Sequence, residues 1–222
     1  MKDIAVMFFT LIVLIALETV PLAAQPHLTS TGLNLGLGFW NMGNEAGSFS
    51  YRRKGEREYF KTPGGGFRVS FTSRTSEKWT FELELSAFWQ AEGESFTSDA
   101  GEESEKVDRK VVIPLLFGAQ WDLLDLNSRS KIRPYLTGGG GPYWIADIKS
   151  VDEFDEPVDE IEGALKLGAY LGGGVTFLPL RNFGLNFNVR YHFVNFDIQN
   201  DVSGIEFGVG LNIMWGNFSS VN

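Results

Sequence analysis

The 222-residue sequence contains no cysteine, two histidines and fewer basic than acidic residues. Without cysteine it can form no disulfide, no thiolate metal site and no lipid attachment through an N-terminal cysteine. His27 and His192 are the only histidines of the sequence. Because histidine is the most common general acid or base, few residues are suited to acid–base catalysis. The formal net charge of −9 argues against a nucleic-acid partner, because phosphate backbones bind surfaces rich in Lys and Arg.

Long apolar runs are scarce as well, and the one that exists lies at the start of the chain. Lys2 supplies a positive charge, residues 4–17 are apolar apart from Thr10, and Ala24 offers a small residue for cleavage. The run is shorter than the roughly 20 residues that a helix needs to cross a bilayer. Residues 1–24 are therefore predicted to be a cleaved signal peptide and residues 25–222 the mature domain. An N-terminal membrane anchor is the alternative.

Aromatic residues and glycine are abundant: 14% of the residues are aromatic, and there are 19 phenylalanines and 26 glycines. Near the carboxyl end, from Phe183 to Phe193 and from Ile205 to Trp215, a large apolar residue occupies every second position. The positions between them hold almost only polar residues or glycine. A period of two indicates strands. One apolar and one polar face is typical of a strand with lipid outside and a polar barrel interior.

The same alternation recurs along the chain and predicts eight strands, at residues 32–42, 66–73, 78–90, 106–122, 131–146, 164–177, 182–196 and 204–216. The first, third and fifth connections, residues 43–65, 91–105 and 147–163, are long and polar, and the connections between them are short. Pro134 and Pro142 weaken the fifth strand, because each lacks a backbone N–H. The sequence therefore predicts an all-β fold, an eight-stranded antiparallel up-and-down transmembrane barrel in the cell outer membrane, with both termini periplasmic.

Two sets of side chains follow from this arrangement. Tryptophans near the strand ends are predicted to form an aromatic girdle at the two bilayer interfaces: Trp40, Trp79, Trp89, Trp121, Trp144 and Trp215.

Charged residues on the polar faces are predicted to form a lumen charge network: Arg68, Glu82, Glu84, Lys166, Arg190 and Glu206. An eight-stranded barrel is barely wide enough for its own side chains, so charges inside it must pair. The hypothesis is that Glu82 or Glu84 pairs with Arg68, Lys166 or Arg190. The network would be either a salt-bridged plug or a narrow gated path.

With the last hairpin and the segment Arg133-Pro-Tyr-Leu-Thr-Gly-Gly-Gly-Gly in view, the chain resembles the small eight-stranded outer-membrane β-barrels of Gram-negative bacteria. These include the OmpA transmembrane-domain, OmpX and OmpW types, and the likeness covers residues 32–215. It implies as partners the lipid bilayer, lipopolysaccharide, periplasmic chaperones and the outer-membrane assembly machinery, which would read the segment from Glu206 to Ile213. The family usually ends at an aromatic residue, whereas seven residues follow Trp215 here.

The resemblance implies a non-enzymatic role in envelope structure or surface interaction, with at most narrow passage of small solutes. OmpW-like transport of small hydrophobic molecules is the first alternative. A lipid-A-modifying enzyme is the second, although such enzymes carry a His-x-Ser pair that is missing around His192. No cofactor, catalytic residue or metal site is expected. The acidic residues Asp152, Glu153, Asp155 and Glu156 lack the ligand spacing of a calcium-binding loop. A soluble lipocalin-like barrel, with its apolar face inward, is the alternative architecture.

Overall fold

The computed structural model describes residues 30–42, 52–54, 57–62, 64–76, 78–97, 103–124, 130–151, 158–180, 182–194 and 202–216. The predicted signal peptide, His27 and residues 152–156 lie outside them. Within the described ranges, no helix is long and apolar enough to cross a membrane.

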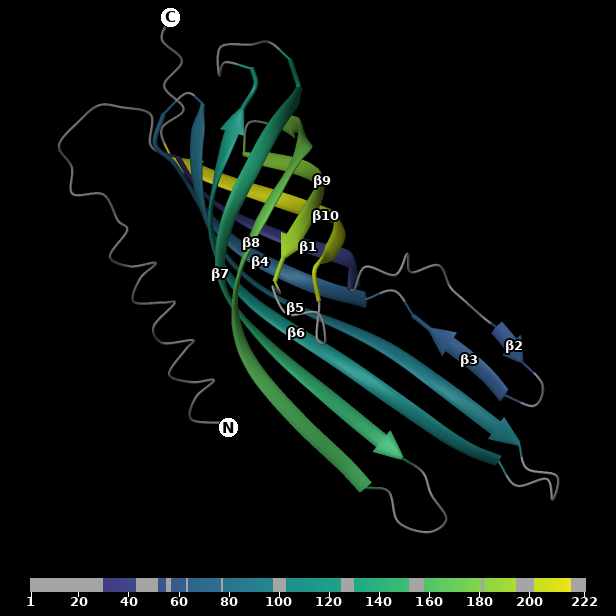
Figure 1. Cartoon of the computed structure of the whole chain (residues 1–222). Coiled ribbons are helices and arrows are strands. Elements are labelled where there is room, and N and C mark those ends of the chain that lie inside the picture. The colour runs from purple at the N-terminus through teal and green to yellow at the C-terminus, as the bar shows by residue number, and fades with distance from the viewer. Residues whose placement is uncertain are drawn as a thin grey trace, which may run out of the picture.

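The described residues form one antiparallel sheet that closes on itself (Figure 1). Its strands are β1 (Ser30–Met42), β2 (Arg52–Lys54), β3 (Arg57–Lys61), β4 (Gly64–Arg74), β5 (Trp79–Thr97), β6 (Glu103–Asp122), β7 (Ile132–Val151), β8 (Val158–Leu180), β9 (Phe183–Phe193) and β10 (Gly204–Gly216). Eight of them form a ring in chain order, because β1 pairs with β10 and with β4, and each later strand pairs with the next. The short strands β2 and β3 lie outside this ring and attach to β5. The predicted eight-stranded up-and-down barrel is confirmed.

The strands of the ring are strongly staggered. Following paired residues once around the barrel from Trp40 leads through Glu206, Arg190, Gly172, Thr137, Gln120, Thr80 and Arg74 to Ser30. The path therefore returns to β1 at a residue that comes ten positions before Trp40 in the sequence. A stagger of this kind requires the strands to tilt against the barrel axis.

The apolar side chains point outward. Leu37 is 66% exposed, Phe39 is 61% exposed and Leu167 is 77% exposed. The outward positions of β1, β4, β9 and β10 carry no charged residue. On β5 the outward residues Trp79 and Trp89 are ten residues apart. At ~3.4 Å per residue and a tilt of ~40°, they bound an apolar belt about 26 Å high. The lipocalin-like alternative, which requires the apolar face inside, is therefore wrong.

Glycines make room for the large side chains inside the barrel. Tyr170 lies across Gly118 and Gly139, and Arg68 lies across Gly36 and Gly208. A Cβ atom on Gly208 would be 2.6 Å from Arg68 Nη2, and one on Gly36 would be 2.7 Å from Arg68 Nε. A Cβ atom this close would force the Arg68 side chain to shift, so glycine at these two positions leaves Arg68 the space that it occupies.

Four strands, β5 to β8, continue into segments that were predicted to be loops. The segments 91–105 and 147–163 were expected to be loops, but β5 and β6 stay paired up to Thr97 and Glu103, and β7 and β8 up to Val151 and Val158. The prediction failed because a strand beyond the apolar belt needs no apolar outer face, so the alternation that marks it disappears. The first long connection also contains β2 and β3.

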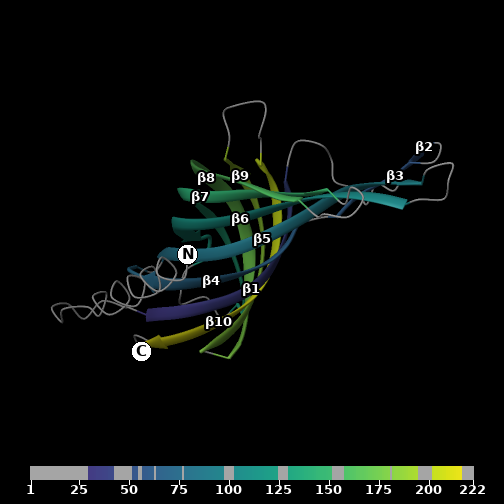
Figure 2. The same cartoon turned by 90° about the horizontal axis from the view of Figure 1, so that it is seen from below.

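These longer strands build an extension on one side of the barrel. The extension consists of β2, β3 and residues 91–97, 103–109, 147–151 and 158–163 of β5 to β8. Figures 1 and 2 show it running well past the ends of β1, β9 and β10. On β7, Val151 lies eight residues beyond Tyr143, or about 26 Å along the strand at ~3.3 Å per residue.

Candidate functional site

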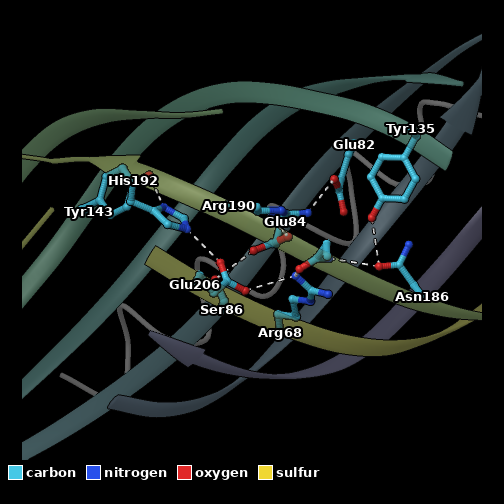
Figure 3. A network of polar contacts seen from close by, with 11 residues as sticks. Arg68, Glu82, Glu84, Ser86, Tyr135, Tyr143, Asn186, Arg190, His192 and Glu206 are labelled. Atoms are coloured by element: carbon cyan, nitrogen blue, oxygen red, sulfur yellow. Dashed lines mark hydrogen bonds and ion pairs between the residues drawn. The ribbon is translucent and has the colours of Figure 1, made fainter. Parts of the chain in front are cut away.

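The centre of the barrel interior holds two neighbouring groups of buried charges (Figure 3). Arg190 donates from Nη1 to Glu84 Oε2 at 2.6 Å and from Nη2 to Glu82 Oε2 at 3.2 Å. Arg68 donates from Nη1 to Glu206 Oε1 at 3.1 Å and to Asn188 Oδ1 at 2.9 Å. The charged side chains are less than a tenth exposed. Arg190 is therefore held by two carboxylates of β5, and Arg68 by one carboxylate of β10 and an amide oxygen of β9, which fixes these strands against one another.

His192 extends this network toward the end of the barrel that carries the long connections. Its Nε2 lies 2.8 Å from Glu206 Oε2 and its Nδ1 lies 3.0 Å from the Tyr143 hydroxyl. Its ring centroid is 4.4 Å from that of Trp40. Both ring nitrogens are engaged and the side chain is fully buried, so His192 is held in one orientation.

Toward the short-connection end the interior stays polar. Tyr135 donates its hydroxyl hydrogen to Asn186 Oδ1 at 3.0 Å, and Asn186 Nδ2 donates to Thr176 Oγ1 at 3.1 Å. Further along, Asp122 forms an ion pair with Arg74 and accepts a hydrogen bond from Gln120 Nε2 at 2.7 Å. Hydrogen-bonding side chains therefore occupy the interior from His192 down to this end.

The opposite end is closed by apolar and aromatic side chains that we call the apolar collar: Trp40, Met42, Phe88, Val112, Leu116, Tyr143, Ile145, Tyr170, Val194 and Val202. Trp40 lies at its centre, with ring centroids 5.3 Å from Phe88 and 6.1 Å from Tyr143. Sequence reasoning missed this cluster because it expected a polar interior. The signal was present, since Val112 and Leu116 occupy the inward positions of the fourth predicted strand.

The structure brings five residues of the predicted charge network together: Arg68, Glu82, Glu84, Arg190 and Glu206. Of the three cations hypothesised to pair with Glu82 or Glu84, Arg190 does so and contacts both glutamates, whereas Arg68 pairs with Glu206. Lys166 is not part of this group. It lies opposite Tyr143 in the pairing of β7 with β8, nearer the long-connection end, and is partly exposed.

Of the six tryptophans predicted to form the girdle, five face outward: Trp79, Trp89, Trp121, Trp144 and Trp215. Trp79 stacks on Trp121 with centroids 6.5 Å apart. The placement of Trp40 in the girdle is wrong, because its side chain is fully buried inside the barrel. Like Asn34, Gly36 and Gly38, Trp40 is an even-numbered residue of β1. Side chains alternate along a strand, so all four positions face the barrel interior.

The surroundings of His192 and the acidic side chains of the interior bear on catalysis and metal binding. Among the described residues, no three acidic, histidine or cysteine side chains could hold a metal ion. His192 has a tyrosine hydroxyl and a carboxylate as its partners and no exposed surface. An external lipid substrate could not reach it without the collar coming apart.

Comparisons with known proteins bear on the architecture of this chain alone. No protein-family model and no curated protein sequence matches the chain. Among solved structures, the outer-membrane protein OprG from Pseudomonas aeruginosa superimposes with a TM-score of 0.51 and 14% identity, covering 86% of this chain and 98% of OprG. Neisserial surface protein A gives 0.45 and 13%, covering 83% and 96%. Outer membrane protein W of Escherichia coli gives 0.40 and 15%, covering 86% and 100%. The match to OprG shows that the two chains share a fold.

Proposed function

We propose that this chain is an integral outer-membrane β-barrel with no enzymatic activity, which serves the cell envelope by presenting the extension to partners outside the cell. The observation that carries the proposal is the combination of an outward apolar belt with a sheet that continues beyond it. The belt supports a lipid environment, because a water-facing surface with this much exposed aromatic and aliphatic area would aggregate. Its height of about 26 Å fits the ~25 Å band of such barrels. OprG, which shares the fold, is described as an outer-membrane protein.

The side chains of the extension support contact with water. Glu92, Arg109 and Glu162 are exposed there, and Asp147 forms a partly exposed ion pair at 3.7 Å with Lys110, the residue of β6 next to the extension. β1 begins and β10 ends at the opposite end of the barrel, where Ser30 pairs with Gly216. In the orientation usual for these barrels, that end faces the periplasm, with both chain termini, and the extension faces outward.

The filled interior supports a structural role over transport or catalysis. Hydrophobic solutes would have to pass the apolar collar and then a layer of paired charges, both of which are tightly occupied. We infer that the barrel acts mainly as an anchor. Its expected partners are the bilayer and lipopolysaccharide around the belt, and periplasmic chaperones and the outer-membrane assembly machinery during biogenesis.

Cell fractionation and external proteolysis test the proposal. The mature chain should fractionate with outer membranes, require detergent for extraction, and migrate differently on gels before and after heating. In intact cells, added protease should cut within the extension and leave the barrel whole. A mature chain that stays in solution without detergent, or an extension cut only after the outer membrane is opened, would refute the proposal.

A further inference from the structure

The extension is an open sheet with two edges, unlike the closed ring from which it continues. Its strands lie in the order β2, β3, β5, β6, β7 and β8, so β2 forms one edge and β8 the other (Figure 1). β8 pairs with β7 from Val158 to Phe177, but its pairing with β9 begins only at Ala169. On the side away from β7, residues 158–167 therefore pair with no strand among the described residues.

This open edge of β8 presents backbone groups that no described strand engages. In an antiparallel sheet, alternate residues of a strand direct their N–H and C=O groups to opposite sides, so about half of residues 158–167 direct theirs away from β7. At ~3.3 Å per residue, the open edge is about 30 Å long. A row of backbone groups like this is a template on which another extended segment can add as a further strand.

The two edges of the extension differ in how far they are protected against such pairing. β2 has only the three residues Arg52, Arg53 and Lys54, and a short strand of basic residues is a common way to block an edge. β8 is long and has no proline between Val158 and Phe177, so its backbone can accept a partner along the open edge. Charges on β8 then decide which segment can add.

The sequence of the open edge indicates the chemistry of that segment. Within the extension, residues 158–163 include Asp159, Glu160 and Glu162 and no basic residue, and Glu162 is exposed. Like charges that lie opposite each other on paired strands are destabilising, whereas opposite charges stabilise the pair. The edge therefore favours a basic partner strand and disfavours an acidic one. The same repulsion opposes pairing between the β8 edges of two copies of the chain.

We propose that residues 158–163 of β8 form a docking edge for an extended, basic segment of another protein outside the cell, which adds to the extension as a new edge strand. Main-chain hydrogen bonds provide the affinity, and the acidic residues provide the selectivity. The inference deepens the proposed function and rests on it, because the docking edge meets such a segment only if the extension lies outside the outer membrane.

Hydrogen exchange of the refolded mature chain in detergent micelles tests the docking edge. The probe is an acetylated peptide of alternating lysine and threonine, as long as residues 158–163. It should bind and slow amide exchange within residues 158–167, while exchange in β5 stays unchanged. A peptide of the same sequence with an N-methyl group on every residue keeps the charge but cannot form the backbone hydrogen bonds of a strand. It should not slow exchange.

Charge reversal separates this edge from the general acidity of the chain. Glu162→Lys places a basic residue on the docking edge and should weaken binding of the lysine–threonine peptide by roughly three- to tenfold. Glu92→Lys is the matched control. Glu92 is also an exposed glutamate of the extension, but its strand β5 is flanked by β3 and β6. This change should alter binding by less than about twofold.

The other outcomes overturn the docking edge. Absence of binding does so directly, and equal binding of the N-methylated peptide would show charge attraction without strand addition. Equal weakening by Glu162→Lys and Glu92→Lys would place the peptide elsewhere on the acidic surface. Exchange in residues 158–167 that slows with rising concentration of the chain, without peptide, would show that a second copy occupies the edge. A chain found outside the outer membrane would refute the proposed function, whereas a correctly located chain that does not bind the peptide refutes only the docking edge.

Discussion

Replacing Arg190 with alanine leaves the carboxylates of Glu82 and Glu84 without their shared cation. Arg190 donates to Glu84 at 2.6 Å and to Glu82 at 3.2 Å, and all three side chains are less than a tenth exposed. Breaking a buried ion pair by removing one partner costs about 3–5 kcal/mol, because the remaining charge stays buried and uncompensated. The guanidinium also lies 4.8 Å from the centroid of the Tyr170 ring, a contact worth about 0.5–2 kcal/mol. We expect the free energy of unfolding to fall by about 3.5–7 kcal/mol.

Urea unfolding in detergent micelles, followed by tryptophan fluorescence and extrapolated to zero denaturant, measures this loss. Lys110→Met is the control, because the Lys110–Asp147 pair is about one third exposed and its loss should cost less than about 1 kcal/mol. Adding Glu82→Gln and Glu84→Gln to Arg190→Ala should restore most of the stability, since no charge is then left uncompensated. The reasoning is refuted if Arg190→Ala costs less than about 1 kcal/mol, or if the triple variant is no more stable than the single one.

Three further predictions use the same unfolding assay. Gly118→Ala should destabilise the barrel by about 1–3 kcal/mol, because its methyl group would meet the Tyr170 hydroxyl; combining it with Tyr170→Phe should recover part of the loss, and an additive result would contradict the clash. Val209→Arg, at an outward position midway along β10, should cost about 2–4 kcal/mol, and a neutral effect would argue against lipid at this face. Tyr143→Phe should cost about 1–3 kcal/mol by leaving His192 Nδ1 without its partner, and an unchanged unfolding midpoint would show that this hydrogen bond adds nothing.

The architecture was readable from sequence because the bilayer imposes a strong pattern. Lipid outside and polar groups inside force the alternation seen from Phe183 to Phe193, and the structure keeps it residue by residue. Beyond the belt both faces meet water, so the pattern no longer marks a strand. For this reason the outer parts of β5 to β8 were taken for loops.

The members of the interior network were predictable, but their partners were not. The alternation of side chains along each strand is enough to place Arg68, Arg190 and Glu206 inside the barrel. Which of them meet depends on the stagger of the ring, which is set by pairing between strands far apart in sequence; Arg68 and Glu206 are 138 residues apart. Lys166 belongs to the predicted charge network for the same reason. The alternation along a strand shows which face a side chain is on, but not its position along the barrel axis. Trp40 lies near a long connection, where girdle residues are expected, but it occupies an inward position of β1 and is fully buried.

The glycines beneath the large inward side chains link positions on different strands in the course of evolution. Gly118 and Tyr170 occupy one space, as do Gly208 and Arg68. A substitution that enlarges one member of such a pair is destabilising unless the other member becomes smaller. Aligned sequences of homologous barrels should therefore show covariation at these pairs, and a wider lumen could arise only through coordinated replacements around the ring.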